Sequence, residues 1–268
     1  MKRIVSAALI LATTLLPTLT RAGSNQDTTP MLNQDEVVRF STEVQETLAV
    51  RGAHVAIVGR VGRDPDTLPN GIEYTHVAYW VYSQMLREDG TSYKGYRVYN
   101  LYQQGKDGRT SRLIQDSPAD FFAGAFELNA GIIIPDKRLQ KKLMGVIASP
   151  AYSQLHNPSY SVLANPTTLQ FQNCTEHTLD VLMASLYGTT SSAQIKANIA
   201  AHFDPHPIKI GGIKRVLAPA ASPALTTADH SGRVATATFG SIARFMQTHD
   251  LDDGIYRQRP GGAISYLN

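Results

Sequence analysis

The chain has 268 residues, of which 43% are hydrophobic and 18% are charged, and its formal net charge is +3. This balance argues for a packed globular protein. A net charge this small, without any run of lysines and arginines, is not the footprint of a nucleic-acid-binding protein, and no nucleic-acid partner is expected.

The first 22 residues have the pattern of a secretory signal peptide. Lys2 and Arg3 supply a positive start, residues 4–19 are mostly apolar and are broken by Pro17, and Ala22 is a small residue suited to cleavage. The apolar run is too short for a comfortable membrane span, and no other stretch approaches the roughly 20 residues that a span requires. We therefore expect cleavage near Ala22 and a periplasmic or secreted protein that is not membrane-spanning.

The remaining chain mixes predicted helices with closely spaced strands. Apolar residues three to four apart predict helices at 34–50, 136–148, 174–186, 191–203 and 241–249, with a short one opening at Ser117. Apolar or alternating runs predict strands at 55–59, 75–82, 96–103, 131–134, 208–216 and 234–239. This order lacks a strict βαβ alternation and indicates an α+β fold. We expect one domain over residues 23–203, with residues 204–268 as an extension packed on the same domain.

Cys174 is the only cysteine, and it stands at the head of a predicted helix. A single thiol cannot form an internal disulfide. Backbone N–H groups and the positive end of the helix dipole favour a thiolate at such a position, which indicates a nucleophile. Two alternatives stay open: a small buried residue without chemistry, or a disulfide with a second chain.

His76 and Asn100 lie inside two predicted strands and could complete a cysteine-based site. A strand histidine can serve as the general base that removes the thiol proton. Asparagine is depleted in strands, and its amide can orient an imidazole by accepting a hydrogen bond from the ring. The alternatives are a core histidine satisfied by hydrogen bonds and a polar side chain on a solvent-facing surface.

Other titratable residues suggest no further site. Glu176 reads as a first-turn acid that suits the helix dipole, and His177 points about one turn away from the thiol. His202 and His206 have the spacing of a metal pair, but prolines interrupt the helix that would align them. We therefore expect neither a metal nor a cofactor, and the sequence lacks phosphate-binding and dinucleotide-binding motifs.

Three segments taken together resemble a known bacterial family. They read Tyr-Thr-His-Val-Ala at 74–78, Val-Tyr-Asn-Leu-Tyr at 98–102 and Phe-Gln-Asn-Cys-Thr-Glu at 171–176. They are similar to the typical blocks of the exported bacterial domain-of-unknown-function family 2145, which read Tyr-Ser-His-x-Gly and Tyr-Gln-Asn-Cys. The order histidine, polar residue, cysteine also resembles the circularly permuted branch of the NlpC-type papain-like fold, which includes lipid acyltransferases and amidases.

The resemblance implies an antiparallel sheet packed against the cysteine-bearing helix, with Cys174 as nucleophile, His76 as base and Asn100 as orienting residue. The backbone of Cys174, with Gln172 or Asn173, would support the oxyanion. The expected function is an exported cysteine hydrolase or acyltransferase acting on cell-wall peptide or an acyl substrate. The rival is a non-catalytic binding or assembly protein that uses a tyrosine-rich surface formed by Tyr79, Tyr82, Tyr96, Tyr99 and Tyr102. The oligomeric state is left open.

Overall fold

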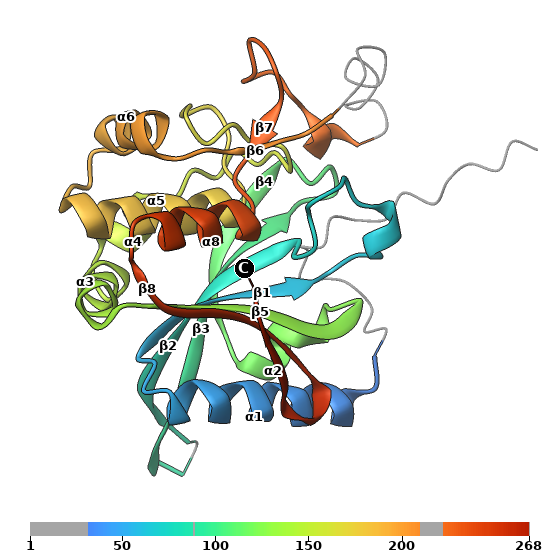
Figure 1. Cartoon of the computed structure of the whole chain (residues 1–268), viewed down its shortest axis with the longest axis vertical. Helices are drawn as coiled ribbons and strands as arrows, with labels where there is room; N and C mark the ends of the chain where they lie inside the picture. Colours follow the sequence, from blue (N-terminus) through green and yellow to red (C-terminus); the bar gives the residue numbers. More distant parts are fainter. Residues whose placement is uncertain (1–31, 88, 210–221, 268) are drawn as a thin grey trace, which may run out of the picture.

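A seven-stranded antiparallel sheet forms the centre of the molecule, with helices on both faces (Figure 1). The computed structural model describes residues 32–87, 89–209 and 222–267, and the predicted signal peptide lies outside them. The strand order is β4-β3-β2-β1-β5-β8-β9. The strands are β1 (Val55–Val61), β2 (His76–Leu86), β3 (Ser92–Gln104), β4 (Thr110–Asp116), β5 (Glu127–Pro135), β8 (Asp252–Arg259) and β9 (Ala263–Tyr266). The prediction of an α+β fold is confirmed.

Two helices cover one face of the sheet, α1 (Gln34–Val50) and α2 (Pro118–Ala123). α1 begins where the Asn33 side chain accepts hydrogen bonds from two first-turn amides, and its buried side chains recur every three to four residues. Val37, Phe40, Val44 and Leu48 thereby join Trp80 of β2 in one apolar cluster. This cluster occupies one face of the sheet and holds β1, β2 and β5 against α1.

The opposite face carries α3 (Lys137–Ile147), α5 (Cys174–Tyr187) and α8 (Phe239–Thr248), with α4 (Ala151–Gln154) and α6 (Ser192–His202) beside them (Figure 1). Leu139, Leu182 and Ile242 from these three long helices pack into one core with Val77 and Tyr79 of β2. α5 is buried over nearly its whole length and ends at Gly188, whose φ of 65° is left-handed. Its first turn thus has a fixed place above the sheet.

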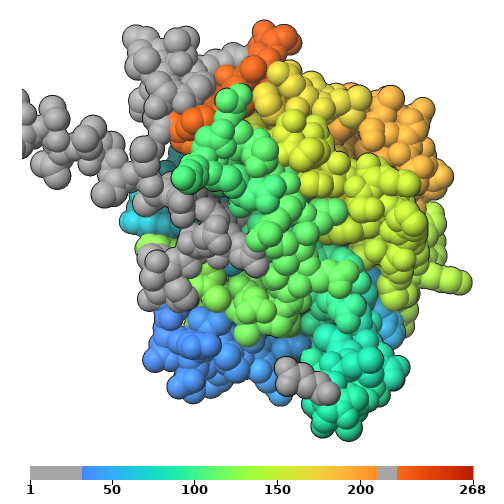
Figure 2. Space-filling view, turned by 180° about the vertical axis from the view of Figure 1, so that it is seen from behind, coloured from blue at the N-terminus to red at the C-terminus, as the bar shows by residue number. Residues whose placement is uncertain are grey.

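The β4 edge of the sheet is covered by the chain that leads from α4 to α5. The Ser111 amide donates to the Pro158 carbonyl, and the Tyr160 amide donates to that of Arg109. Figure 2 shows this yellow-green segment lying against the green strands on that face. Covering an edge in this way blunts its tendency to pair with another chain. It also brings the segment before Cys174 alongside β3 and β4.

Three strands were not predicted from the sequence. β4 is an edge strand rich in polar residues, and β8 and β9 lie in the polar C-terminal segment, which lacks clear alternation. β8 pairs with β5, more than a hundred residues earlier in the chain, so its pairing is set by tertiary contacts. The strand expected at 208–216 falls mostly outside the described residues, and a short pair, β6 (His206–Pro207) with β7 (Ala235–Thr236), lies beside it. Within the described ranges, no helix is long and apolar enough to cross a membrane.

Candidate active site

The sheet opens into a fork at the start of β2. Pairing of β2 with β3 runs from Leu86 opposite Ser92 to Tyr79 opposite Tyr99, and stops before it reaches His76. Beyond that point β3 continues paired with β4 alone. The first residues of β2 and the second half of β3 therefore diverge, and backbone groups on the inner sides of the fork are available to other partners.

His76 and Asn100 bridge this fork with their side chains. The His76 Nε2 lies 2.9 Å from the Asn100 Oδ1, and both residues are fully buried. The Tyr102 ring stacks on the imidazole, with centroids 5.0 Å apart and planes 12° from parallel. The Asn100 amide nitrogen donates in turn to Asp116 at 2.9 Å. Asn100 therefore lies on the neighbouring strand and forms a hydrogen bond with the His76 ring, and its role in orienting a catalytic base stays a prediction.

The other ring nitrogen of His76 is the one a base would use. Within the described part of the chain, the buried Nδ1 has no hydrogen-bond partner. A histidine whose Nε2 donates to an amide oxygen carries its lone pair on Nδ1, so this tautomer can accept a proton there. The ring is thus held in one orientation by Asn100 and Tyr102, with its basic nitrogen uncommitted.

Cys174 reaches the fork from the other side of the sheet. Strand alternation directs His76, Asn100 and Tyr102 toward α2, whereas Val77 and Leu101 face α5. Cys174 packs against Leu101, and the backbone of Val77, the residue after His76, lies close enough to lower the pKa of its thiol. The thiol and the imidazole therefore lie on opposite faces of the sheet, and no hydrogen bond between them is found in the described residues.

Burial determines the protonation of this pair. It raises the pKa of the Cys174 thiol, and hydrogen bonds from Val77 and Thr175 oppose this only in part. Burial, followed by the positive charge of Arg60, lowers the pKa of His76 well below its usual range, and the bond to Asn100 opposes the shift. The free protein therefore holds a neutral thiol beside a neutral imidazole. The thiolate expected from the helix dipole alone is wrong in direction, because desolvation of the charged form outweighs the dipole.

Cys174 also lines a cleft of about 280 Å³. Its walls come from the β1–β2 connection, the segment before α5 and the region around β6 and β7, and most of them are apolar: Leu68, Pro69, Ile72, Val162, Leu163, Ile208 and Leu225. Polar residues also line the cleft, among them Asn173 and Thr175 on either side of Cys174 in the sequence and the basic residues Arg63 and Lys209. A mostly apolar cleft with a few converging polar groups is the usual form of a small-molecule site.

The two residues before the thiol are held by hydrogen bonds at every side-chain polar atom. The Asn173 oxygen caps α5 by accepting from the Glu176 amide at 2.9 Å, and its nitrogen donates to the Val162 carbonyl at 3.1 Å. The buried Gln172 accepts from the Asn157 amide at 2.9 Å and donates to the Leu155 carbonyl at 2.9 Å. Their expected role in supporting an oxyanion is not tested by this arrangement, which shows that they fix the backbone on which Cys174 stands.

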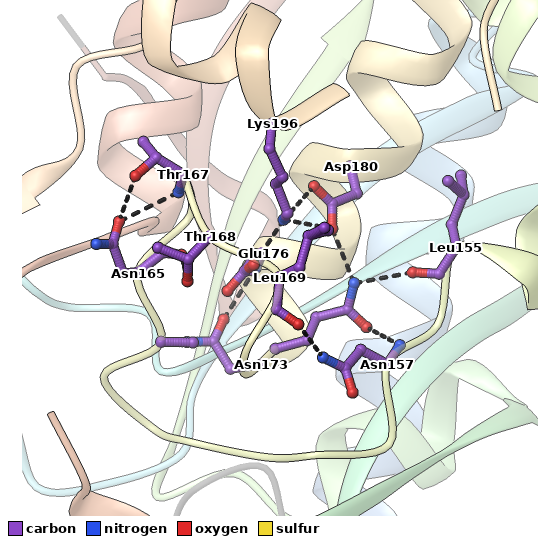
Figure 3. A network of polar contacts seen from close by, with 12 residues as sticks. Leu155, Asn157, Asn165, Thr167, Thr168, Leu169, Asn173, Glu176, Asp180 and Lys196 are labelled. Carbon is purple, nitrogen blue, oxygen red and sulfur yellow. Dashed lines mark hydrogen bonds and ion pairs between the residues drawn. The ribbon is translucent and has the colours of Figure 1, made fainter. Parts of the chain in front are cut away.

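A buried ionic network continues from Gln172 into α5 and α6 (Figure 3). The Gln172 side chain donates to Asp180 at 2.8 Å. Lys196 of α6 contacts Asp180 at 2.7 Å and Glu176 at 2.6 Å, and all three charged side chains are nearly inaccessible. Glu176 was interpreted from the sequence as an acid facing the helix dipole. Its carboxyl instead points to Lys196, and burial raises its pKa well above the usual range.

The remaining sequence candidates lie away from the fork. His177 is buried against Tyr152 at 4.9 Å, and burial lowers its pKa to about 3. Tyr79, Tyr96 and Tyr102 are buried in the sheet core, so the tyrosine-rich strands do not form the surface expected of a binding module. Cys174 is only 4% exposed, which disfavours a disulfide with a second chain. No group of residues suited to holding a metal ion occurs in the part of the chain that the structure describes.

One further residue of the site was missed by sequence analysis. Arg60 of β1 is fully buried opposite His76, donates to the Phe121 carbonyl and lies over the Phe121 ring. An arginine within the otherwise apolar run at 55–61 was the available signal, because arginine is rarely buried unless it is paired.

Comparison with protein families agrees with these segments. The family model described as "Uncharacterized protein conserved in bacteria (DUF2145)" matches residues 47–246. The chain belongs to the DUF2145 family. The matched range includes the fork, the cleft and α5, so His76, Asn100 and Cys174 all lie within the part shared with DUF2145. No curated protein and no solved structure matches the chain.

Proposed function

We propose that this DUF2145 protein is an exported cysteine-dependent hydrolase or acyltransferase that acts on an amide or ester bond. The observation that carries the proposal is the convergence at the fork. Cys174 lies on the α5 side of the fork, near Val77, and Asn100 holds His76 on the other side; in the part of the chain that the structure describes, Nδ1 of His76 has no hydrogen-bond partner. A nucleophile, a base and an orienting group are the three parts of such a site.

The chemical step follows from this arrangement. The Cys174 sulfur attacks the carbonyl carbon of a substrate in the cleft, and the thiol proton passes to His76 Nδ1 as the C–S bond forms. Because the two side chains lie on opposite faces of the sheet and His76 does not line the cleft, this transfer requires the fork to rearrange so that the thiol and the imidazole meet. The amide of Cys174, the first helical residue of α5, is not used within the helix and can donate to the oxyanion. Collapse breaks the C–N or C–O bond, and His76 returns the proton to the leaving group. Water or an acceptor hydroxyl then resolves the thioester.

The order of the parts along the chain supports a permuted papain-like fold. The histidine strand and the asparagine strand precede the cysteine helix, and that helix packs on the antiparallel sheet. Between the two expected substrates, the apolar cleft walls favour an acyl group over a cell-wall peptide, because a peptide needs many polar partners. Export rests on the sequence pattern of residues 1–22.

A binding protein without turnover is the second candidate, and the neutral pair favours it. A nucleophile normally has a depressed pKa, whereas burial raises that of Cys174. In this alternative the cleft holds an apolar ligand and the fork is a buried polar link between β2 and β3.

Trapping of an acyl-enzyme separates the two candidates. The full chain is mixed with p-nitrophenyl acetate or octanoate, quenched in acid and examined by mass spectrometry for acyl groups on the Cys174 peptide. An enzyme gives an adduct on Cys174 that is lost in Cys174→Ser and strongly reduced in His76→Ala. The matched control His202→Ala, on the exposed end of α6, leaves the adduct unchanged.

Two results would count against the enzyme. Acylation that is absent with both esters, while native mass spectrometry shows the octanoyl compound retained, assigns the cleft to binding. Acylation that persists in His76→Ala at the wild-type rate removes His76 as the base.

A further inference from the structure

The network around Lys196 links α6 to the segment that presents the thiol. Three contacts in series connect them: Lys196 to Asp180, Asp180 to Gln172, and Gln172 to the backbone at Leu155 and Asn157 (Figure 3). Gln172 stands two residues before Cys174, and the intervening Asn173 caps the helix. A change at Lys196 can therefore reach the nucleophile without touching it.

The charges of the network divide unequally between the two acids. One ammonium faces two buried carboxyl groups, so a neutral cluster contains one ionised acid and one protonated acid. Asp180 has the better partners, since Lys196 contacts both of its oxygens and Gln172 donates to one of them. Glu176 has one oxygen at Lys196, and its other oxygen, Oε2, is buried without a hydrogen-bond partner in the described residues. Asp180 is thus the anion and Glu176 the neutral acid.

We propose that Lys196 is a positioning residue for Cys174: its ammonium keeps Asp180 ionised as the acceptor of Gln172, and Gln172 in turn holds the segment before the thiol in place. The inference rests on the proposed function only in taking Cys174 as the reactive group. Loss of Lys196 leaves two buried acids without a cation, both acids take up protons, and the charge-assisted bond from Gln172 is lost. The segment 172–175 then opens more often.

Local opening can be measured without any substrate. Hydrogen–deuterium exchange of the amides at 172–175 is compared with that of β5 in the full chain, and labelling of the buried thiol by iodoacetamide is followed in parallel. Losing the hydrogen bond from Gln172 to a charged partner should speed local opening of this segment roughly 10- to 100-fold. Lys196→Met should give this increase at 172–175 and in thiol labelling, with little change in β5, and Lys196→Arg should restore slow exchange.

A double-mutant cycle tests the proposed route through Gln172. Gln172→Leu alone should loosen the same amides, and adding Lys196→Met to it should bring little further change, because the link is already broken. Lys142→Met is the matched control. Lys142 contacts the Leu186 carbonyl at the C-terminal end of α5, far from Cys174 at its start. If Lys196→Met does not fold, Asp180→Asn instead removes the anion that accepts from Gln172, with nearly the same side-chain shape.

Three outcomes would overturn the inference. Exchange at 172–175 could be unchanged, it could rise together with β5 as in global unfolding, or the two variants could add fully in the cycle. Because these measurements use no substrate, they stand apart from the acylation experiment. A protein without turnover can still show the Lys196 effect, and an active enzyme can lack it.

Discussion

The protonation of Cys174 should be visible in how the stability of the protein depends on pH. Burial raises the pKa of this thiol in the folded state, whereas the unfolded chain has a free thiol of about 8.5. Between the two values the folded protein binds the proton more tightly than the unfolded chain. The stabilisation is therefore fully present below about pH 8.5 and is lost as pH rises toward the folded pKa.

The size of the pH effect on stability is set by the single proton of the Cys174 thiol. The free energy of unfolding of the wild type should fall by up to about 1.4 kcal/mol per pH unit relative to Cys174→Ala. Buried tyrosines, such as Tyr74 with a pKa raised to about 12, also lose stability at high pH. They are present in both proteins, so their contribution cancels in the difference. The loss of sulfur packing in the variant is a constant offset that does not change with pH.

Urea unfolding from pH 7 to pH 10 in the presence of a reducing agent gives the required free energies. The difference between wild type and Cys174→Ala should be flat to about pH 8 and then decline. A difference that instead rises between pH 6 and pH 8.5 would mean a depressed thiol pKa, as in a preformed ion pair with His76. Parallel curves over the whole range would refute the claim that burial controls this thiol.

Three further substitutions test the packing that supports the site. Asn100→Ala should lower the free energy of unfolding by about 1–3 kcal/mol in urea, because it leaves buried polar partners unsatisfied, whereas the exposed Asn70→Ala should stay within about 0.5 kcal/mol. Gly131→Ala should lower the free energy of unfolding by about 1–3 kcal/mol, because the added methyl group would lie 2.7 Å from the Tyr74 ring. An unchanged thermal midpoint would contradict this. The methyl group added by Gly145→Ala in α3 would lie in open space, so this substitution should raise the free energy of unfolding, measured by calorimetry, by about 0.5–1 kcal/mol. A decrease in stability would contradict this.

The elements that the sequence predicts well are those with strong local signals. α1 begins and ends where the apolar period and Asn33 indicate, and α5 starts at Cys174 behind its Asn173 cap. β4 and β8 carry polar residues on both faces or lie at an edge, so their pairing depends on partners far away in the chain. The local sequence pattern cannot supply that information, which is why no strand was predicted at β4, β8 or β9.

The candidate site residues that the sequence indicated are likewise those with a local signal. His76 and Asn100 were found because polar residues inside strands conflict with propensity and so demand a reason. Glu176 was misread because a first-turn acid has a sufficient local explanation in the helix dipole. Its partner Lys196 lies in the next helix, on a stripe with Ile195 and Ile199 that packs against α5. A lysine beside two buried isoleucines, with acids at 176 and 180 one turn apart, was the signal for a buried ion pair.

A neutral thiol and a neutral imidazole, although they favour the binding protein, are also compatible with an active site. At these buried positions an ion pair would require the desolvation of two charges, which is why both pKa values move toward the uncharged forms. A serine–histidine pair works from the same neutral resting state, with proton transfer occurring as the nucleophile attacks. A positive charge then develops on His76 while a negative charge develops on the oxyanion, and the N-terminus of α5 faces the oxyanion. Such a site resists alkylation at neutral pH yet acylates with a substrate that fills the cleft, so slow iodoacetamide labelling combined with rapid acylation by an octanoyl ester is the pattern that this geometry predicts.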